Sequence, residues 1–160
     1  MLKLITKTIA AVAVVSVALL GSVNAKTLKI ETHFTANSPN GEVAAQFAKN
    51  VEMFSGGSLK VEMFYSSSVT GKSAEVFNSA QTGIIDCDMT GAGYQTGKNA
   101  AFQFAGDVMG GYDNPYQQYE FLNFPGAQEA VDALYNKYGM TLIGWWIPGH
   151  ESLISSKPIP

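Results

Sequence analysis

The 160-residue sequence contains no arginine, and all ten of its basic residues are lysines. A guanidinium group is the side chain that grips a carboxylate with two parallel hydrogen bonds, so no residue of this sequence can supply that clamp. Cysteine is nearly absent too, because Cys87 stands alone, and this excludes a disulfide-stapled scaffold. Basic charge is scarce: the formal net charge is −3 at pH 7. Nucleic acid is therefore excluded as an expected partner, since binding a polyanion requires basic surface.

Long hydrophobic runs are absent except near the N-terminus. There, two lysines precede a 12-residue apolar run from Ile9 to Leu20, and small residues follow up to Ala25. This order is typical of a secretory signal that is cleaved, and the run is shorter than the roughly 20 residues needed to span a bilayer. We predict a signal peptide over residues 1–25, with an uncleaved anchor as the alternative. The mature protein is expected to be exported, to carry a net charge of −5 and not to insert into the membrane.

Strand-like and helix-like runs alternate after residue 25, which favours an α/β fold. Alternating polarity predicts three strands, over residues 28–34, 59–65 and 84–90. The first helix is predicted to begin at Ser38-Pro39, a cap followed by proline, and to end at Gly56-Gly57. A second helix is predicted over 72–81, with Phe77 and Ile84 on its buried side. This order predicts a βαβαβ unit with an at least partly parallel sheet.

The second half of the sequence is less regular. Asn114-Pro115 predicts the start of a helix that ends near Phe124, and Pro125-Gly126 separates it from another helix that runs to Tyr138. The almost entirely apolar segment 140–146 predicts a fourth, fully buried strand. Because an extended segment leads into the final proline, we expect this sequence to be the N-terminal part of a longer protein.

Four polar residues and the cysteine could carry chemistry, and each has an ordinary structural interpretation as well. Asp86 and Asp88 share a strand face, and paired carboxylates can act as acid and base or hold a metal. Because no third ligand lies nearby in sequence, a solvated or helix-capping strand face is the favoured alternative. His33 and His150 follow strands without metal-ligand spacing, so a surface position and a ligand contact both stay open. Cys87 is interpreted as a small buried hydrophobe rather than a reactive thiol.

The glycine-rich segment Gly91–Gly97 follows a strand, where a dinucleotide-binding motif would lie. Its third glycine comes one residue late, so we predict a flexible loop instead of a nucleotide site. The position still matters, because open α/β sheets bind ligands outside the carboxyl ends of their strands. Tyr94, Trp145 and Trp146 follow or end predicted strands, and for the tryptophans a core position and a pocket wall both stay open. No Gly-x-Ser-x-Gly motif nominates a hydrolase nucleophile.

Several short motifs, in a fixed order behind the signal peptide, resemble one family: Ser38-Pro39, Gly56–Val61, Gln81–Asp86, Ala92–Tyr94, Thr141–Trp145 and Ser155–Ile159. From Lys26 onward the sequence is similar to the N-terminal half of the solute-binding proteins of tripartite ATP-independent periplasmic (TRAP) transporters. The resemblance implies a type II periplasmic-binding-protein-like lobe in a two-lobed protein. Such a protein closes on a small organic acid in the periplasm and delivers it to membrane permease subunits, with no cofactor, no metal and no catalysis.

The resemblance also implies a division of the chain and a set of ligand-binding residues. Residues 26–150 correspond to the solute-binding lobe, and 151–160 to the start of a hinge strand toward a second lobe. The family arginine that holds the ligand carboxylate lies shortly beyond the segment matching Lys157-Pro158-Ile159. The residues that fall where relatives line the cleft are His33, Tyr94, Trp146 and Glu151.

Two of these cleft positions depart from the family pattern, because Tyr94 and Glu151 stand where some relatives carry arginine. The ligand is therefore expected to differ from that of those relatives. A carboxylate at Glu151 favours a ligand with hydroxyl or amine donors, or a bound cation. The alternatives are a small periplasmic enzyme that uses Asp86, Asp88 or Glu151 as acid–base groups, and a binding protein that serves a membrane sensor.

Overall fold

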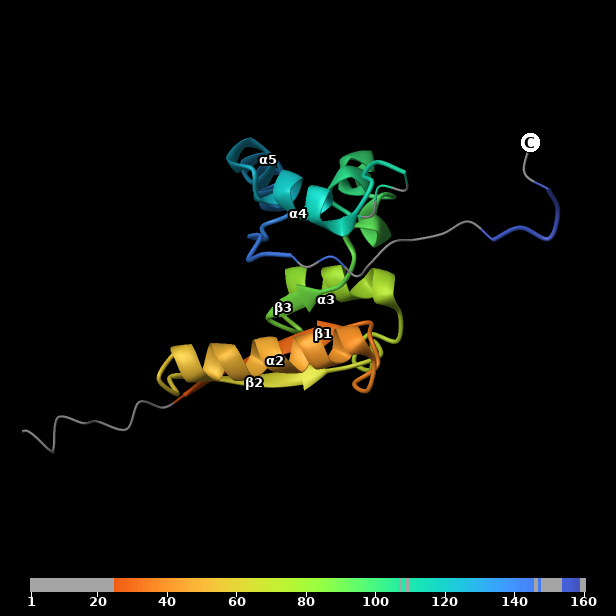
Figure 1. Ribbon diagram of the computed structural model, residues 1–160. Coiled ribbons are helices and arrows are strands. Elements are labelled where there is room, and N and C mark those ends of the chain that lie inside the picture. Colours follow the sequence, from red (N-terminus) through yellow and green to blue (C-terminus); the bar gives the residue numbers. More distant parts are fainter. Residues whose placement is uncertain (1–24, 107, 109, 146, 148–153, 159–160) are drawn as a thin grey trace, which may run out of the picture.

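The computed structural model describes residues 25–106, 108, 110–145, 147 and 154–158. The elements in chain order, labelled in Figure 1, are β1 (Lys26–Thr32), α2 (Pro39–Phe54), β2 (Leu59–Phe64), η1 (Ser73–Glu75), α3 (Val76–Gln81), β3 (Cys87–Met89), η2 (Ala92–Gln95), η3 (Ala100–Ala105), α4 (Pro115–Asn123) and α5 (Pro125–Asn136). Among the described residues, no helix is long and apolar enough to cross a membrane. The predicted signal peptide, apart from Ala25, lies outside the described residues.

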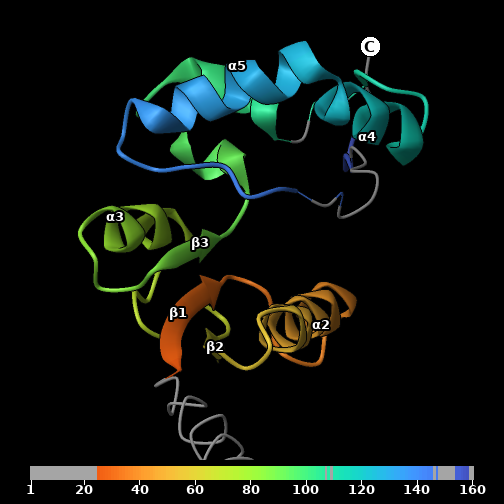
Figure 2. The ribbon, with the colours of Figure 1, turned by 90° about the vertical axis from the view of Figure 1, so that its left-hand side faces the viewer.

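The sheet has three parallel strands in the order β2-β1-β3. The chain moves from β1 to β2 through α2, and then returns past β1 to β3 through α3. Because parallel crossovers are right-handed, two crossovers in opposite directions place their helices on opposite faces of the sheet. Figure 2 shows this arrangement, with α2 and α3 on either side of the strands. The structure confirms the predicted α/β fold and its parallel βαβαβ unit.

Local sequence determines where α2 begins and ends. The Ser38 hydroxyl oxygen accepts a hydrogen bond from the Gly41 amide at 3.1 Å, and Pro39 occupies the first turn. Gly41 is buried, and a Cβ there would collide with the carbonyl oxygens of Thr35 and Ala36, so no larger residue fits. At the other end Gly56 adopts a φ of 61°, as predicted.

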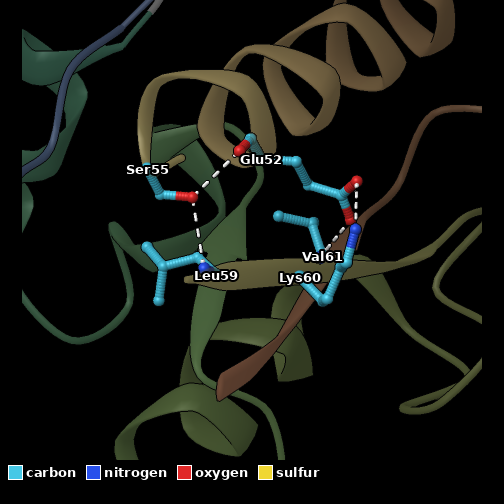
Figure 3. A network of polar contacts seen from close by, with 5 residues as sticks. All are labelled: Glu52, Ser55, Leu59, Lys60 and Val61. Atoms are coloured by element: carbon cyan, nitrogen blue, oxygen red, sulfur yellow. Dashed lines mark hydrogen bonds and ion pairs between the residues drawn. The ribbon is translucent and has the colours of Figure 1, made fainter. Parts of the chain in front are cut away.

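The end of α2 is tied to the start of β2 by a small polar network (Figure 3). The Val61 amide donates to Glu52 Oε1 at 3.0 Å, and the Lys60 ammonium lies 3.4 Å from Oε2. Ser55 Oγ accepts from the Leu59 amide at 3.1 Å. The hydrogen bond from Val61 lowers the pKa of Glu52, with a further contribution from Lys60. This network fixes the turn between helix and strand.

An aromatic core joins α3 to the second half of the chain. Its buried residues are Phe77, Ala92, Phe102 and Leu134, with Tyr135 and Tyr138 packed against them. The Phe77 and Phe102 rings meet edge to face, with centroids 5.8 Å apart. Through this core, η2, η3 and α5 pack against α3, the helix between β2 and β3.

Three predictions about local structure were wrong. Residues 140–145 form no strand, and Thr141, Ile143 and Gly144 are exposed. Within the described residues the Leu142 amide donates to the Asp132 side chain and not to a neighbouring strand, and a strand requires such a neighbour. Ile84 is exposed rather than buried, because α3 ends before it at Gln81. The predicted flexible loop contains the turn η2, which is anchored through buried Gln95.

We expect Ser38→Ala to lower the free energy of unfolding by about 1 kcal/mol, because it leaves the Gly41 amide at the start of α2 without its side-chain acceptor. Urea denaturation measures the change. Ser38→Asp restores an acceptor and is expected to recover most of the loss. Equal loss in both variants would contradict the capping role.

Candidate functional site

The candidate site lies where β1 and β3 end, at the carboxyl edge of the parallel sheet. His33 follows β1, and Tyr94 belongs to η2, the first turn after β3. Their rings meet edge to face with centroids 5.4 Å apart, and the Phe34 ring lies 3.9 Å from that of His33. Tyr94 is half exposed, so one side of this aromatic group is open to solvent. Trp146, Glu151 and His150 lie outside the described residues.

His33 is placed to form hydrogen bonds rather than to supply positive charge. It is partly buried, and the loss of hydration lowers its pKa below the usual 6.5. Its Nδ1 atom is buried without a hydrogen-bond partner among the described residues. At neutral pH the imidazole is therefore uncharged and offers one donor and one acceptor.

A pair of acidic residues lies beneath this edge, one on each strand. Glu31 of β1 is the register partner of Asp88 of β3, and Glu31 is fully buried. Burial raises the pKa of Asp88 to about 6; the negative charge of Glu31 adds to this, and the polar groups of Thr90 oppose it. Asp88 therefore changes its charge near neutral pH.

Asp86, which directly precedes β3, and Asp88, which lies within it, have different roles. Asp86 is exposed and accepts a hydrogen bond from the Lys29 amide at 2.8 Å, so it braces the strand pair. Asp88 is mostly buried and its Oδ1 has no hydrogen-bond partner among the described residues. Cys87, between them, is half buried, and burial raises its pKa, which suits an unreactive thiol. In the described part of the chain no three His, Cys, Asp or Glu residues are grouped to hold a metal.

A loop after β2, here called the serine loop (Ser66–Gly71), lies beside the end of β1. The Ser66 amide donates to the Phe34 carbonyl at 3.0 Å, and the Ser67 amide donates to the Thr32 carbonyl at 3.0 Å. These two hydrogen bonds hold the loop against the backbone on both sides of His33. Sequence analysis missed this loop and Glu31 as parts of the site, because their roles depend on contacts between distant segments.

An apolar hollow of about 280 Å³ lies elsewhere, between η3, α4 and α5. Alanines together with Phe104, Phe121 and Leu134 line it. Neither His33 nor Tyr94, the two predicted ligand-binding residues that the structure describes, contributes to its wall. It is therefore separate from the candidate site at the sheet edge.

Comparison with protein families gives a match to the bacterial extracellular solute-binding protein family 7 over residues 30–160. The chain belongs to this family. A periplasmic TRAP solute-binding protein from Rhodobacter sphaeroides, in an open form without ligand, shares its fold with a TM-score of 0.71 and 27% identity. The match covers 77% of this chain and 39% of that protein. The sequence thus spans about two fifths of that relative's length, and no curated protein matches it.

Two further TRAP solute-binding proteins have the same fold. The protein from Colwellia psychrerythraea matches with a TM-score of 0.64 and 24% identity, over 72% of this chain and 35% of its own, and its structure holds calcium and pyruvate. The protein from Pseudoalteromonas atlantica matches with a TM-score of 0.66 and 20% identity, over 72% and 35%, and holds sodium and pyruvate. The family and these neighbours are solute-binding proteins rather than enzymes, and the family is a periplasmic one.

Proposed function

We propose that this chain is the part of a TRAP solute-binding protein that receives a small organic acid at the carboxyl edge of its sheet. The observation that carries the proposal is the meeting of His33 with Tyr94 at that edge, in a chain of the solute-binding family. Open α/β sheets bind ligands at this edge, outside the ends of their strands. Trp146 and Glu151 complete the proposed set of ligand-binding residues.

A carboxylate ligand is proposed on chemical grounds and by analogy. Pyruvate occupies the structures from Colwellia psychrerythraea and Pseudoalteromonas atlantica, and picolinate with calcium occupies one from Bordetella bronchiseptica. All three neighbours therefore bind a small carboxylate. This chain has no arginine and its His33 is neutral, so its own edge suits the uncharged part of such a ligand. The strong charge clamp would then come from outside these residues.

The proposed setting is the periplasm. There, the predicted signal peptide over residues 1–25 would have been removed, and TRAP membrane permease subunits would accept the captured solute. A protein that serves a membrane sensor would bind ligand in the same way, so transport is tested by uptake of labelled solute in cells with and without the gene.

Binding is tested by thermal unfolding of the full-length protein with single organic acids, including pyruvate and picolinate. A solute at about 100 times its Kd is expected to stabilise the folded state by about 2.7 kcal/mol, without product formation. Tyr94→Ala is expected to weaken binding about tenfold, because it removes a half-exposed wall of the site.

The matched control is Tyr116→Ala, which removes an even more exposed tyrosine from α4, away from the sheet edge. It is expected to leave affinity unchanged. Equal weakening by both variants, or turnover of a solute, would argue against the proposed binding site.

A further inference from the structure

The serine loop is held in place by a buried carboxylate. We propose that Glu31 is a positioning residue, which fixes Ser66–Gly71 as a hydroxyl-bearing edge of the solute site beside His33. The claim that this loop borders a solute site rests on the proposed function. Its structural half, the control of the loop by Glu31, stands on contacts within this chain.

Glu31 reaches the loop from the end of β1. Its Oε1 atom accepts hydrogen bonds from the Val69 amide at 2.7 Å and from the Thr70 amide at 3.3 Å. The side chain is fully buried, so water does not compete for these bonds. A charged acceptor makes stronger hydrogen bonds than a neutral one. Oε1 has two such partners, whereas Oε2 is buried without a hydrogen-bond partner among the described residues.

The loop has a conformation that its own residues disfavour. Ser66 and Ser67 have φ values of 57° and 51°, in the left-handed region that glycine adopts more readily. Two such residues in succession require support from outside the loop. The support comes from the carbonyls of Thr32 and Phe34 and from the Glu31 carboxylate.

The hydrogen bonds also determine which groups the loop can offer to a solute. The amides of Ser66, Ser67, Ser68 and Gly71 donate to backbone carbonyls, and the two amides between them donate to Glu31. No amide from 66 to 71 is left to bind an anion. The exposed side chains of Ser66 and Ser68 are what remain, so the loop offers the solute neutral hydroxyl groups, which can donate and accept hydrogen bonds.

Two variants of Glu31 in the full-length protein separate positioning from charge. Glu31→Met fills a similar volume without an acceptor oxygen, and Glu31→Gln keeps the acceptor while removing the same charge. Amide hydrogen exchange should show about tenfold or greater loss of protection at Val69 and Thr70 in the methionine variant, and little loss in the glutamine variant. If Glu31→Met does not fold, Glu31→Met/Ser66→Gly replaces it, since glycine relieves part of the strain.

The second readout is the titration of His33, followed by NMR. Release of the loop should hydrate the imidazole and raise the pKa of His33 toward 6.5 in the methionine variant only. Unchanged protection in that variant, or loss of protection in both, would overturn the positioning role. Lost protection with an unmoved His33 would overturn the placement of the loop at the site. Failure of the wild-type protein to bind any organic acid would refute the proposed function and leave both readouts intact.

Discussion

Phe77→Ala is expected to lower the free energy of unfolding by about 3–5 kcal/mol, the largest loss that a single truncation in this core should cause. The Phe77 side chain is fully buried, and its ring contacts those of Phe102, Tyr135 and Tyr138. Because these rings belong to η3, α5 and the residues after it, the cavity would open where α3 meets the second half of the chain.

Urea denaturation of the variant measures this loss. Phe54→Ala is the matched control, because Phe54 ends α2 with most of its surface exposed, and its truncation is expected to cost less than about 1 kcal/mol. A similar loss in both variants would show that ring contacts around Phe77 do not hold the two halves together.

The first half of the fold could be predicted because its elements are encoded locally. Ser38-Pro39 and Gly56-Gly57 define α2 through a cap, a fixed φ and a left-handed residue, all of which act within a few residues. The parallel sheet then follows from the order of elements, since short connections leave only crossover helices between strands.

The segment 140–145 shows where local pattern is insufficient. Its apolar residues fit a buried strand, but a strand exists only where another backbone supplies its hydrogen bonds. Met140 and Leu142 instead bond back to Tyr135 and Asp132 of α5. An apolar run thus predicts burial or pairing only when the partner is known.

The positions of two candidate-site residues were predictable for the same reason. His33 and Tyr94 follow strands of a parallel sheet, and such positions lie at one edge. The structure brings their rings together there, whereas their role in ligand binding was implied by the family resemblance and stays a prediction. Glu31 was missed because strand alternation places it on a polar face and cannot tell what covers that face. The conformation of Ser66 and Ser67 was missed because serine gives no sequence signal for a positive φ.

Asp88→Asn is expected to raise the free energy of unfolding at pH 8 by about 3 kcal/mol. The pKa of Asp88 is about 6 in the folded protein and 3.8 as a free side chain, and each unit of difference corresponds to about 1.36 kcal/mol. Because the folded state binds this proton more tightly than the unfolded state, Asp88 costs nothing well below pH 3.8. The cost grows as the pH rises to about 6 and is constant above it. An asparagine resembles the protonated acid and removes the cost.

The gain should therefore fall to about 0.5 kcal/mol near pH 4, and this pH dependence identifies the buried charge as its cause. Tyr135 of α5, which faces Asp88, does not mimic it between pH 4 and 8, because burial raises the pKa of Tyr135 to about 12. Glu31, which lies beside Asp88 on β1, is the same residue in the wild-type and variant proteins. The lowered pKa of His33 has the opposite effect on stability, because it lowers the free energy of unfolding as the pH falls below 6.5. His33 is present in both the wild-type protein and the variant, so its contribution cancels in their difference. Asp86→Asn, exposed on the same segment, keeps an acceptor oxygen for the Lys29 amide and is expected to change the free energy by less than about 0.5 kcal/mol at either pH. A gain for Asp88→Asn that is equal at pH 4 and pH 8 would show that packing, and not the buried charge, sets the stability of this strand pair.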